Sequence, residues 1–197
     1  MKILVLDADG VMIEHEYFTK TLELEMGISH DVTQEFFSEK FSDCVVGKSD
    51  LKKEIAPYLK QWGWKESVDE FLNFWFEAEN KPNKALVEYV KKAKEKGIKV
   101  VLATNQEKYR LNYVKKEMGF ENLFDMIICS SDIGFKKPSE KFFVKLCEKL
   151  NQTYNVTKKD IIFWDDNKEN VDSANRLEIR SFVYEDFEDF QKIMLNF

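Results

Sequence analysis

The sequence predicts an α/β fold, with a Rossmann-like doubly wound parallel sheet core and an inserted α-helical cap domain. Over most of the chain, short continuous apolar runs alternate with stretches of helical periodicity, which is typical of parallel strands buried on both faces and joined by helices. One interval, residues 16–81, shows helical periodicity only. A length of 197 residues, of which 44% are hydrophobic, suits one compact core with a modest insert.

The expected strands are the apolar runs of the alternating part. They lie at residues 3–6, 100–103, 126–129 and 161–164, with a weaker run at 179–184. The expected helices carry apolar residues at helical spacing, several with a glycine just beyond their end. They lie at residues 83–96, 108–118, 139–150, 167–175 and 186–195. This alternation predicts a parallel sheet with right-handed crossover connections.

The helical interval is expected to form a separate cap. Four apolar faces, around Leu22, Phe36, Leu51 and Phe71, indicate four short helices, and their aromatic residues are expected to form the cap's own hydrophobic core. Residues 80–83 are expected to return the chain to the core, with Pro82 in the first turn of the next helix. Ser49 is the expected N-cap of a cap helix. The predicted domains are a core of residues 1–15 and 82–197 and a cap of residues 16–81.

Composition and charge exclude several classes of protein. A formal net charge of −6 and a scarcity of arginine argue against nucleic-acid binding. The 3 cysteines are too few to form a disulfide framework and include no C-x-x-C pair, which favours a reduced intracellular compartment. No apolar run approaches the ~18 residues of a membrane span. The sequence therefore predicts a cytoplasmic protein that binds neither nucleic acid nor membrane. Whether it is a monomer or a homodimer stays open.

Polar residues follow the expected strands. The list is Asp7-Ala8-Asp9-Gly10 after the first, Thr104-Asn105 after the second, Gly134-Phe135-Lys136-Lys137-Pro138 beyond the third, and Asp165-Asp166 after the fourth. Ligands of open parallel sheets bind at the carboxyl ends of the strands. Carboxylates gathered there repel one another unless a cation lies between them, and the absence of a His or Cys cluster favours Mg²⁺ over zinc. A lysine, a hydroxyl and an amide beside that cation would bind the oxygens of a phosphate.

Taken alone, each of these segments has a plainer structural interpretation, such as a helix cap or a solvated lysine face. Their order resembles the four motifs of the haloacid dehalogenase-like (HAD) hydrolase superfamily. The insert after the first motif is similar in position and helicity to that of the subgroup with a small α-helical cap. The resemblance covers residues 1–15 and 82–185. It implies a Mg²⁺-dependent phosphomonoester hydrolase that acts through an aspartyl-phosphate on a small phosphorylated metabolite, sugar phosphates included.

The resemblance also implies a role for each motif residue. Asp7 would be the nucleophile, and Asp9 would be the general acid and then the general base. Thr104, Asn105 and Lys137 would bind the phosphate, with Lys137 also neutralising charge during catalysis. The expected metal ligands are the following: Asp7, Asp9 through its main-chain carbonyl, Asp166 and Asp165.

Some points of the pattern stay open. Asp165 would either join the metal ligands or hold Lys137. Asn170 stands where the family often has a further carboxylate, so its amide is an alternative ligand. Lys136 competes with Lys137, and only the register to Gly134 and Pro138 favours the latter. Trp164 beside the aspartate pair is bulky enough to narrow the site.

Other functions remain as alternatives. A phosphosugar mutase would need groups that residues 14–16, including His15, do not clearly supply. A dehalogenase is disfavoured because Asp9 is present, and displacing a halide needs no proton donor. A non-catalytic phosphate-binding member also remains, whereas a receiver-type domain is disfavoured because the Asp165-Asp166 pair comes last.

Overall fold

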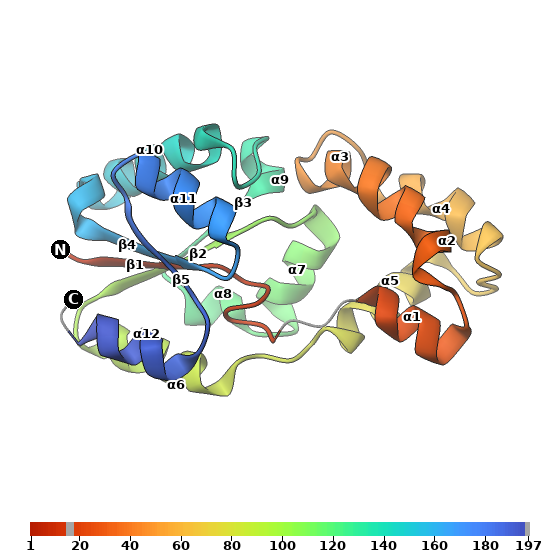
Figure 1. The fold of residues 1–197 in the computed structure, drawn as a ribbon, viewed down its shortest axis with the longest axis horizontal. Coiled ribbons are helices and arrows are strands. Elements are labelled where there is room, and N and C mark those ends of the chain that lie inside the picture. The colour runs from red at the N-terminus through yellow and green to blue at the C-terminus, as the bar shows by residue number, and fades with distance from the viewer. Residues whose placement is uncertain (15–17, 196–197) are drawn as a thin grey trace.

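A five-stranded, wholly parallel sheet forms the centre of the computed structural model, which describes residues 1–14 and 18–195. Its strands are β1 (Ile3–Leu6), β2 (Lys99–Thr104), β3 (Met126–Cys129), β4 (Ile161–Asp165) and β5 (Arg180–Val183). Their order across the sheet is β3-β2-β1-β4-β5, so the first strand lies at the centre (Figure 1). The expected α/β fold with a parallel sheet is confirmed, with the five apolar runs as its strands.

Helices cover both faces of the sheet. They are α6 (Lys84–Glu95), α7 (Lys108–Lys116), α8 (Phe120–Leu123), α9 (Ser130–Ile133), α10 (Glu140–Tyr154), α11 (Lys168–Arg176) and α12 (Phe187–Met194), with a 3₁₀ turn, η2 (Lys158–Asp160). The helices α10 and α11 lie on one face, and α6 and α12 lie on the other (Figure 1). This arrangement explains why the inner strands β1, β2 and β4 carry apolar residues on both faces.

The central strand β1 shows how the two faces are filled. Its side chains alternate between them, so Leu4 and Leu6 pack in the cluster under α6 and α12, whereas Ile3 and Val5 pack in the cluster under α10 and α11. All four are fully buried. A strand buried on both faces forms a rigid support, and the chain that leaves its carboxyl end begins with Asp7.

A second group of helices lies beyond the carboxyl ends of the strands (Figure 1). It consists of α1 (Phe18–Met26), α2 (His30–Glu35), the π-helical turn η1 (Phe36–Lys40), α3 (Phe41–Val45), α4 (Leu51–Gln61) and α5 (Val68–Ala78). We call residues 18–78 the helical segment. It has its own hydrophobic cluster, in which Phe36, Ile55 and Phe71 are fully buried. Its aromatic residues therefore form the expected internal core.

Hydrogen bonds tie the helical segment to the sheet core at a point remote in sequence from its two connections. The Ser130 hydroxyl donates to the Val45 carbonyl over 2.6 Å, and the Lys136 ammonium donates to the Ser42 hydroxyl over 2.7 Å. The two parts also pack closely here: a Cβ added to Gly47 would lie 2.5 Å from the Ser131 carbonyl oxygen. The helical segment is thus held against the carboxyl edge of the sheet.

Local details differ from the sequence expectations. Asp50, not Ser49, caps α4, because its carboxylate accepts the backbone N–H groups of Lys52 and Lys53. The helix α6 begins after an Asn83 cap, so Pro82 precedes the helix instead of standing in its first turn. The apolar face around Phe36 is part of a run, α2-η1-α3, and not a separate helix. Among the described residues, no helix has the length and apolar character needed to cross a membrane.

Phe71 supplies a test of the segment's internal core. Its ring is fully buried, so Phe71→Ala is expected to lower the free energy of unfolding by about 3–5 kcal/mol, through lost apolar burial and the cavity left behind. Leu24→Ala, at a side chain that is 76% exposed on α1, should change it by less than about 0.5 kcal/mol. Urea denaturation followed by tryptophan fluorescence measures both, and equal effects of the two substitutions would contradict the packing.

Candidate active site

Side chains from four distant parts of the chain meet at the carboxyl edge of the sheet. Asp7 follows β1, Thr104 ends β2 and Asp165 ends β4. Lys137 comes from the loop between α9 and α10 and is only 2% exposed. The predicted motif residues are therefore brought together in space, although up to 159 positions separate them in the sequence, from Asp7 to Asp166.

The Lys137 ammonium lies between two carboxylates. Its Nζ is 2.7 Å from Asp7 Oδ1 and donates to Asp165 Oδ2 over 2.6 Å. Burial by itself would lower the pKa of Lys137, but the charges of Asp7 and Asp165 more than offset it, so the pKa is raised and the side chain stays cationic. Lys136, the competing candidate, donates to Ser42 in the helical segment, so the register to Pro138 identified the lysine that reaches the aspartates.

The Asp7 carboxylate is buried and makes close polar contacts. Its Oδ1 accepts the Ala8 N–H over 2.6 Å in addition to the contact with Lys137. Burial raises the pKa of the Asp7 carboxyl well above its usual value; Lys137 opposes this rise and the Asp165 charge adds to it. A further positive charge at this edge would favour the ionised carboxylate.

Asp165 is fixed by hydrogen bonds on both of its oxygens. Oδ2 accepts from Lys137, and Oδ1 accepts from the Asn167 backbone over 2.9 Å and from the Asn170 side-chain amide over 2.8 Å. Of the two alternatives left open for Asp165, these bonds favour holding Lys137. The Asn170 amide nitrogen donates to Asp165 and so helps to hold that carboxylate.

Three carboxylates are close enough to share a cation. One oxygen from each of Asp7, Asp165 and Asp166 lies within 4.8 Å of the others. Gly10, at φ +79°, makes room for this approach, since a Cβ at that position would overlap the Asp166 carboxylate. Three carboxylates against one ammonium leave an excess of negative charge, and oxygen-only ligands fit a hard divalent ion such as Mg²⁺. The residues present therefore fit the expected metal.

The Thr104 hydroxyl is buried and has no hydrogen-bond partner in the described part of the chain. An unpaired buried hydroxyl is costly, so this atom points to a ligand. The neighbouring Asn105 differs. Its amide accepts the Lys137 N–H over 2.8 Å and donates to the Lys137 carbonyl over 2.9 Å, so both its polar atoms hold the lysine backbone.

Asp9 belongs to a network that the sequence reasoning missed. The Gln106 amide donates to Asp9 Oδ2, and the Arg110 guanidinium lies 3.9 Å from Asp9 Oδ1 and 3.4 Å from Glu79 Oε2. Burial, with help from the Asp9 charge, raises the pKa of Glu79 to about 7, against the opposing effect of Arg110. Arg110 lies on α7 six positions after Thr104, and the scarcity of arginine in the chain was the available signal for it.

Two other expectations concern the surroundings of the site. Trp164 does not narrow it, because its ring packs in the core against Phe182 and Phe190, at centroid distances of 5.1 and 4.9 Å. A residue in a strand points to the opposite face from its neighbour, so Trp164 turns away from Asp165. His15, named above in connection with a mutase, and Glu16, where the predicted cap begins, lie outside the described residues.

A cavity of about 370 Å³ opens beside Asp9, between the sheet core and the helical segment. Core residues Asp9, Gln106 and Arg110 line it from one side, and Phe37 and Trp75 of the helical segment line it from the other. The cavity adjoins the acidic cluster, because Asp9 lies two residues after Asp7 in the chain and Asn105, which also lines it, follows Thr104.

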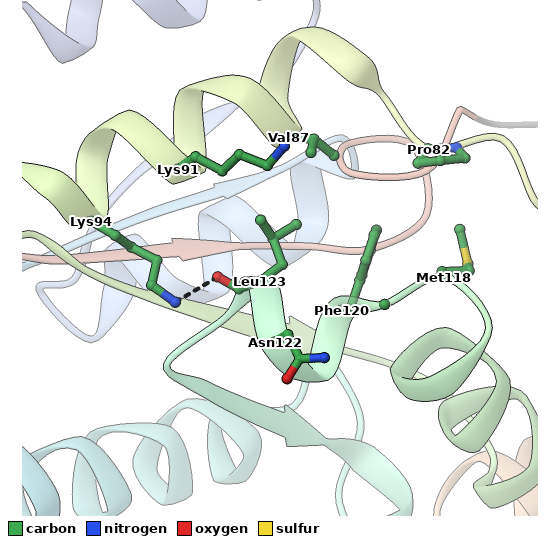
Figure 2. Close-up of a pocket in the computed structure, with 9 residues that line it drawn as sticks. Pro82, Val87, Lys91, Lys94, Met118, Phe120, Asn122 and Leu123 are labelled. Carbon is green, nitrogen blue, oxygen red and sulfur yellow. Dashed lines mark hydrogen bonds between the residues drawn. The ribbon is translucent and has the colours of Figure 1, made fainter.

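A larger cavity, of about 510 Å³, lies away from this edge between α6 and α8 (Figure 2). Apolar side chains line it from both helices, Val87 from α6 and Phe120 and Leu123 from α8. Its two lysines are engaged: Lys94 donates to the Leu123 carbonyl over 2.9 Å, and Lys91 pairs with Glu88. It holds none of the aspartates and is not a candidate for the chemistry described above.

Comparison with known proteins agrees with the motifs. The haloacid dehalogenase-like hydrolase family matches residues 1–177. The chain belongs to this family. The expected membership, inferred from the order of four short motifs, is confirmed.

Solved structures show the same fold. A predicted HAD-like family hydrolase from Porphyromonas gingivalis is 17% identical, with a TM-score of 0.77 and coverage of 99% of this chain and 98% of that one. A HAD family enzyme from Bacteroides thetaiotaomicron, in complex with magnesium and inorganic phosphate, is 19% identical, with a TM-score of 0.73 over 96% and 98% of the two chains. At these identities the likeness concerns the fold.

Two further matches are named for other chemistries. An L-2-haloacid dehalogenase from Xanthobacter autotrophicus is 18% identical, with a TM-score of 0.64 over 92% of this chain and 76% of that one. The drimenol cyclase drtB of Aspergillus calidoustus is 32% identical over 74 residues, which are 38% of this chain; the match spans 13% of that relative's length. Membership of the family therefore does not by itself determine the reaction, which depends on the residues of the site.

Gly10 tests the acidic cluster. Gly10→Ala places a methyl group on the Asp166 carboxylate and is expected to weaken Mg²⁺ binding by about tenfold or more, as is typical when the groups that orient a metal site are disturbed. Gly63→Ala is the matched control, since Gly63 has φ +78° with open space around it. Isothermal titration with Mg²⁺ measures both variants. Unchanged affinity in Gly10→Ala would contradict a metal site at this edge.

Proposed function

We propose that this member of the family is a Mg²⁺-dependent phosphomonoester hydrolase, acting through an aspartyl-phosphate intermediate on a small phosphorylated metabolite, sugar phosphates included. The observation that carries the proposal is the Lys137 ammonium held between Asp7 and Asp165, with the Asp166 carboxylate at the same edge. The unpartnered Thr104 hydroxyl adds a donor for a phosphate oxygen. The phosphate and magnesium in the Bacteroides relative are consistent with this chemistry.

The metal would be held by Asp7, Asp166 and the main-chain carbonyl of Asp9. Asp165 completes the acidic cluster, and its hydrogen bonds to Lys137 and Asn170 suit it to hold the lysine. When bound, Mg²⁺ supplies positive charge that offsets the carboxylates and the phosphate oxygens. The side chains of the site carry out the nucleophilic attack and the proton transfers.

In the first step, Asp7 attacks phosphorus and the bond to the ester oxygen breaks. Asp9 gives its proton to the departing oxygen, which leaves as an alcohol. Lys137 neutralises charge on the phosphoryl oxygens and on Asp7, and the Thr104 hydroxyl donates a hydrogen bond to the phosphoryl group. A carboxylate suits the first role because it is ionised at neutral pH without a separate activating base once a cation offsets its burial.

In the second step, Asp9 acts as the base that removes a proton from water. The water oxygen attacks phosphorus, the acyl–phosphate bond breaks, and inorganic phosphate leaves with Asp7 restored as a carboxylate. Asp9 is thereby protonated again for the next turnover. The amide of Gln106 and the guanidinium of Arg110 hold the Asp9 carboxyl in place on the side of the cavity.

Asn105 takes a positioning role in this scheme, in place of the substrate-binding role expected from the motif. Its amide spans the Lys137 backbone and fixes the loop that presents the ammonium. We further propose that residues 1–15 and 82–197 form the catalytic domain and 16–81 a cap that closes over it, and that the protein is cytoplasmic and binds neither nucleic acid nor membrane. Its assembly as a monomer or a homodimer is a matter for sedimentation.

The test of this function is phosphate release from a panel of small phosphomonoesters and from acetyl phosphate, with and without Mg²⁺. Asp7→Asn removes the nucleophile and is expected to reduce release by about 10³-fold or more, while Asp172→Asn, at a surface ion pair with Lys168, should retain the parent rate. Chelation of Mg²⁺ should abolish release in both. Equal rates for Asp7→Asn and the parent would reject the proposed mechanism.

A further inference from the structure

The cavity beside Asp9 has aromatic walls. Phe18, Phe37, Phe41 and Trp75 line it from the helical segment. Their rings support one another: Phe18 stacks on Trp75 at a centroid distance of 5.2 Å, and Phe37 meets Trp75 edge-on at 5.3 Å. Such walls stabilise an apolar group by roughly 25 cal/mol for each Å² removed from water. They offer a sugar few hydrogen bonds, because their side-chain polar groups, among the described residues, are only the Thr19 hydroxyl, the His30 imidazole and the Trp75 indole N–H.

Three of the polar side chains that the core contributes to the cavity already have partners. Asn105 uses both its amide atoms on the Lys137 backbone, and Gln106 donates to Asp9. The Glu107 carboxylate accepts the backbone N–H groups of Tyr109 and Arg110 as the cap of α7. A polyhydroxylated leaving group would lose its bonds to water and find few replacements, which is how a site of this kind discriminates.

The charges of the cavity disfavour a second anion. Arg110 is the only described lining residue with a permanent positive charge, and its guanidinium faces the carboxylates of Asp9 and Glu79 and donates to the Phe76 carbonyl over 3.1 Å. Glu14 and Glu107 also line the cavity. A carboxylate or second phosphate on the leaving group would meet more negative charge than positive.

We infer that this cavity binds the alcohol part of the substrate and selects a compact, apolar and uncharged group, so the substrate class is the phosphomonoester of an apolar alcohol. This inference rests on the proposed function and narrows it. The phosphate lies at Asp7 and Lys137, and the ester oxygen lies beside Asp9, the residue that both lines the cavity and would protonate the departing alcohol.

Three esters of primary alcohols test the selection at a similar leaving-group pKa. They are benzyl phosphate, 4-carboxybenzyl phosphate and glucose 6-phosphate. For the Mg²⁺-loaded full chain, kcat/KM for benzyl phosphate is expected to exceed the other two by about tenfold or more, the range that apolar pockets and unpaired polar groups give. A higher or equal kcat/KM for glucose 6-phosphate, or equal values for the two benzyl esters, would overturn the inference.

A charge placed in the cavity supplies a second, independent readout. Thr19 on α1 lines the cavity and is half-buried, so Thr19→Lys brings an ammonium to the wall without removing core volume. The ratio of kcat/KM for 4-carboxybenzyl over benzyl phosphate is expected to rise by about tenfold. Thr21→Lys is the control, because Thr21 is not among the described lining residues and points about 200° away around the same helix. An unchanged ratio in Thr19→Lys would count against the assignment.

Acetyl phosphate separates this inference from the proposed function. Its small acyl group leaves the cavity unfilled, so its hydrolysis depends on Asp7 and not on the aromatic walls. Asp7-dependent release from acetyl phosphate, with no preference among the three esters, would overturn the substrate class alone. No Asp7-dependent release from acetyl phosphate or from any ester would overturn the function, and the inference with it.

Discussion

The ammonium of Lys137, buried between Asp7 and Asp165, is the interaction on which the site depends. Moving any of these three charges out of water is costly, and each is tolerated because the others are present. The hydrogen bonds around them follow from the same constraint: Asn105 holds the lysine backbone, and Asn167 and Asn170 hold the second carboxylate. The arrangement keeps the Asp7 carboxylate, the proposed nucleophile, next to a fixed positive charge at the end of the central strand.

The two parts of the molecule make different contributions to the chemistry. The sheet core supplies rigid supports, since Asp7, Thr104 and Asp165 each end or follow a strand buried on both faces. The helical segment supplies the aromatic wall of the cavity beside Asp9 and is tied to the core through Val45 and Ser42. In this account the core residues carry out the reaction, and the helical segment selects the alcohol part of the substrate.

The strands and the edge that holds the site could be predicted, because both depend on residues that are neighbours in the sequence. Continuous apolar runs identified the strands, and the order of polar residues after them identified the carboxyl edge. The cap of α4 was misplaced by one residue because Ser49 and Asp50 are both good N-cap residues, and only the structure shows which side chain accepts the N–H groups. The contact between Arg110, Asp9 and Glu79 could not be predicted, since it depends on how the helical segment docks on α7. The hydrogen bonds of the Asn105 side chain could not be predicted either, because their partner, the Lys137 backbone, lies 32 residues away in sequence.

The central claim is that Asp7 carries the phosphoryl group during turnover. Rapid quenching of the Mg²⁺-loaded enzyme with substrate, followed by borohydride reduction and mass spectrometry of the N-terminal peptide, tests it directly, because borohydride reduces an acyl phosphate to an alcohol and leaves a free carboxylate intact. The account predicts reduction at Asp7 that appears with substrate and is absent without it. Reduction at another carboxylate, or turnover with Asp7 unmodified during a burst of released alcohol, would contradict it.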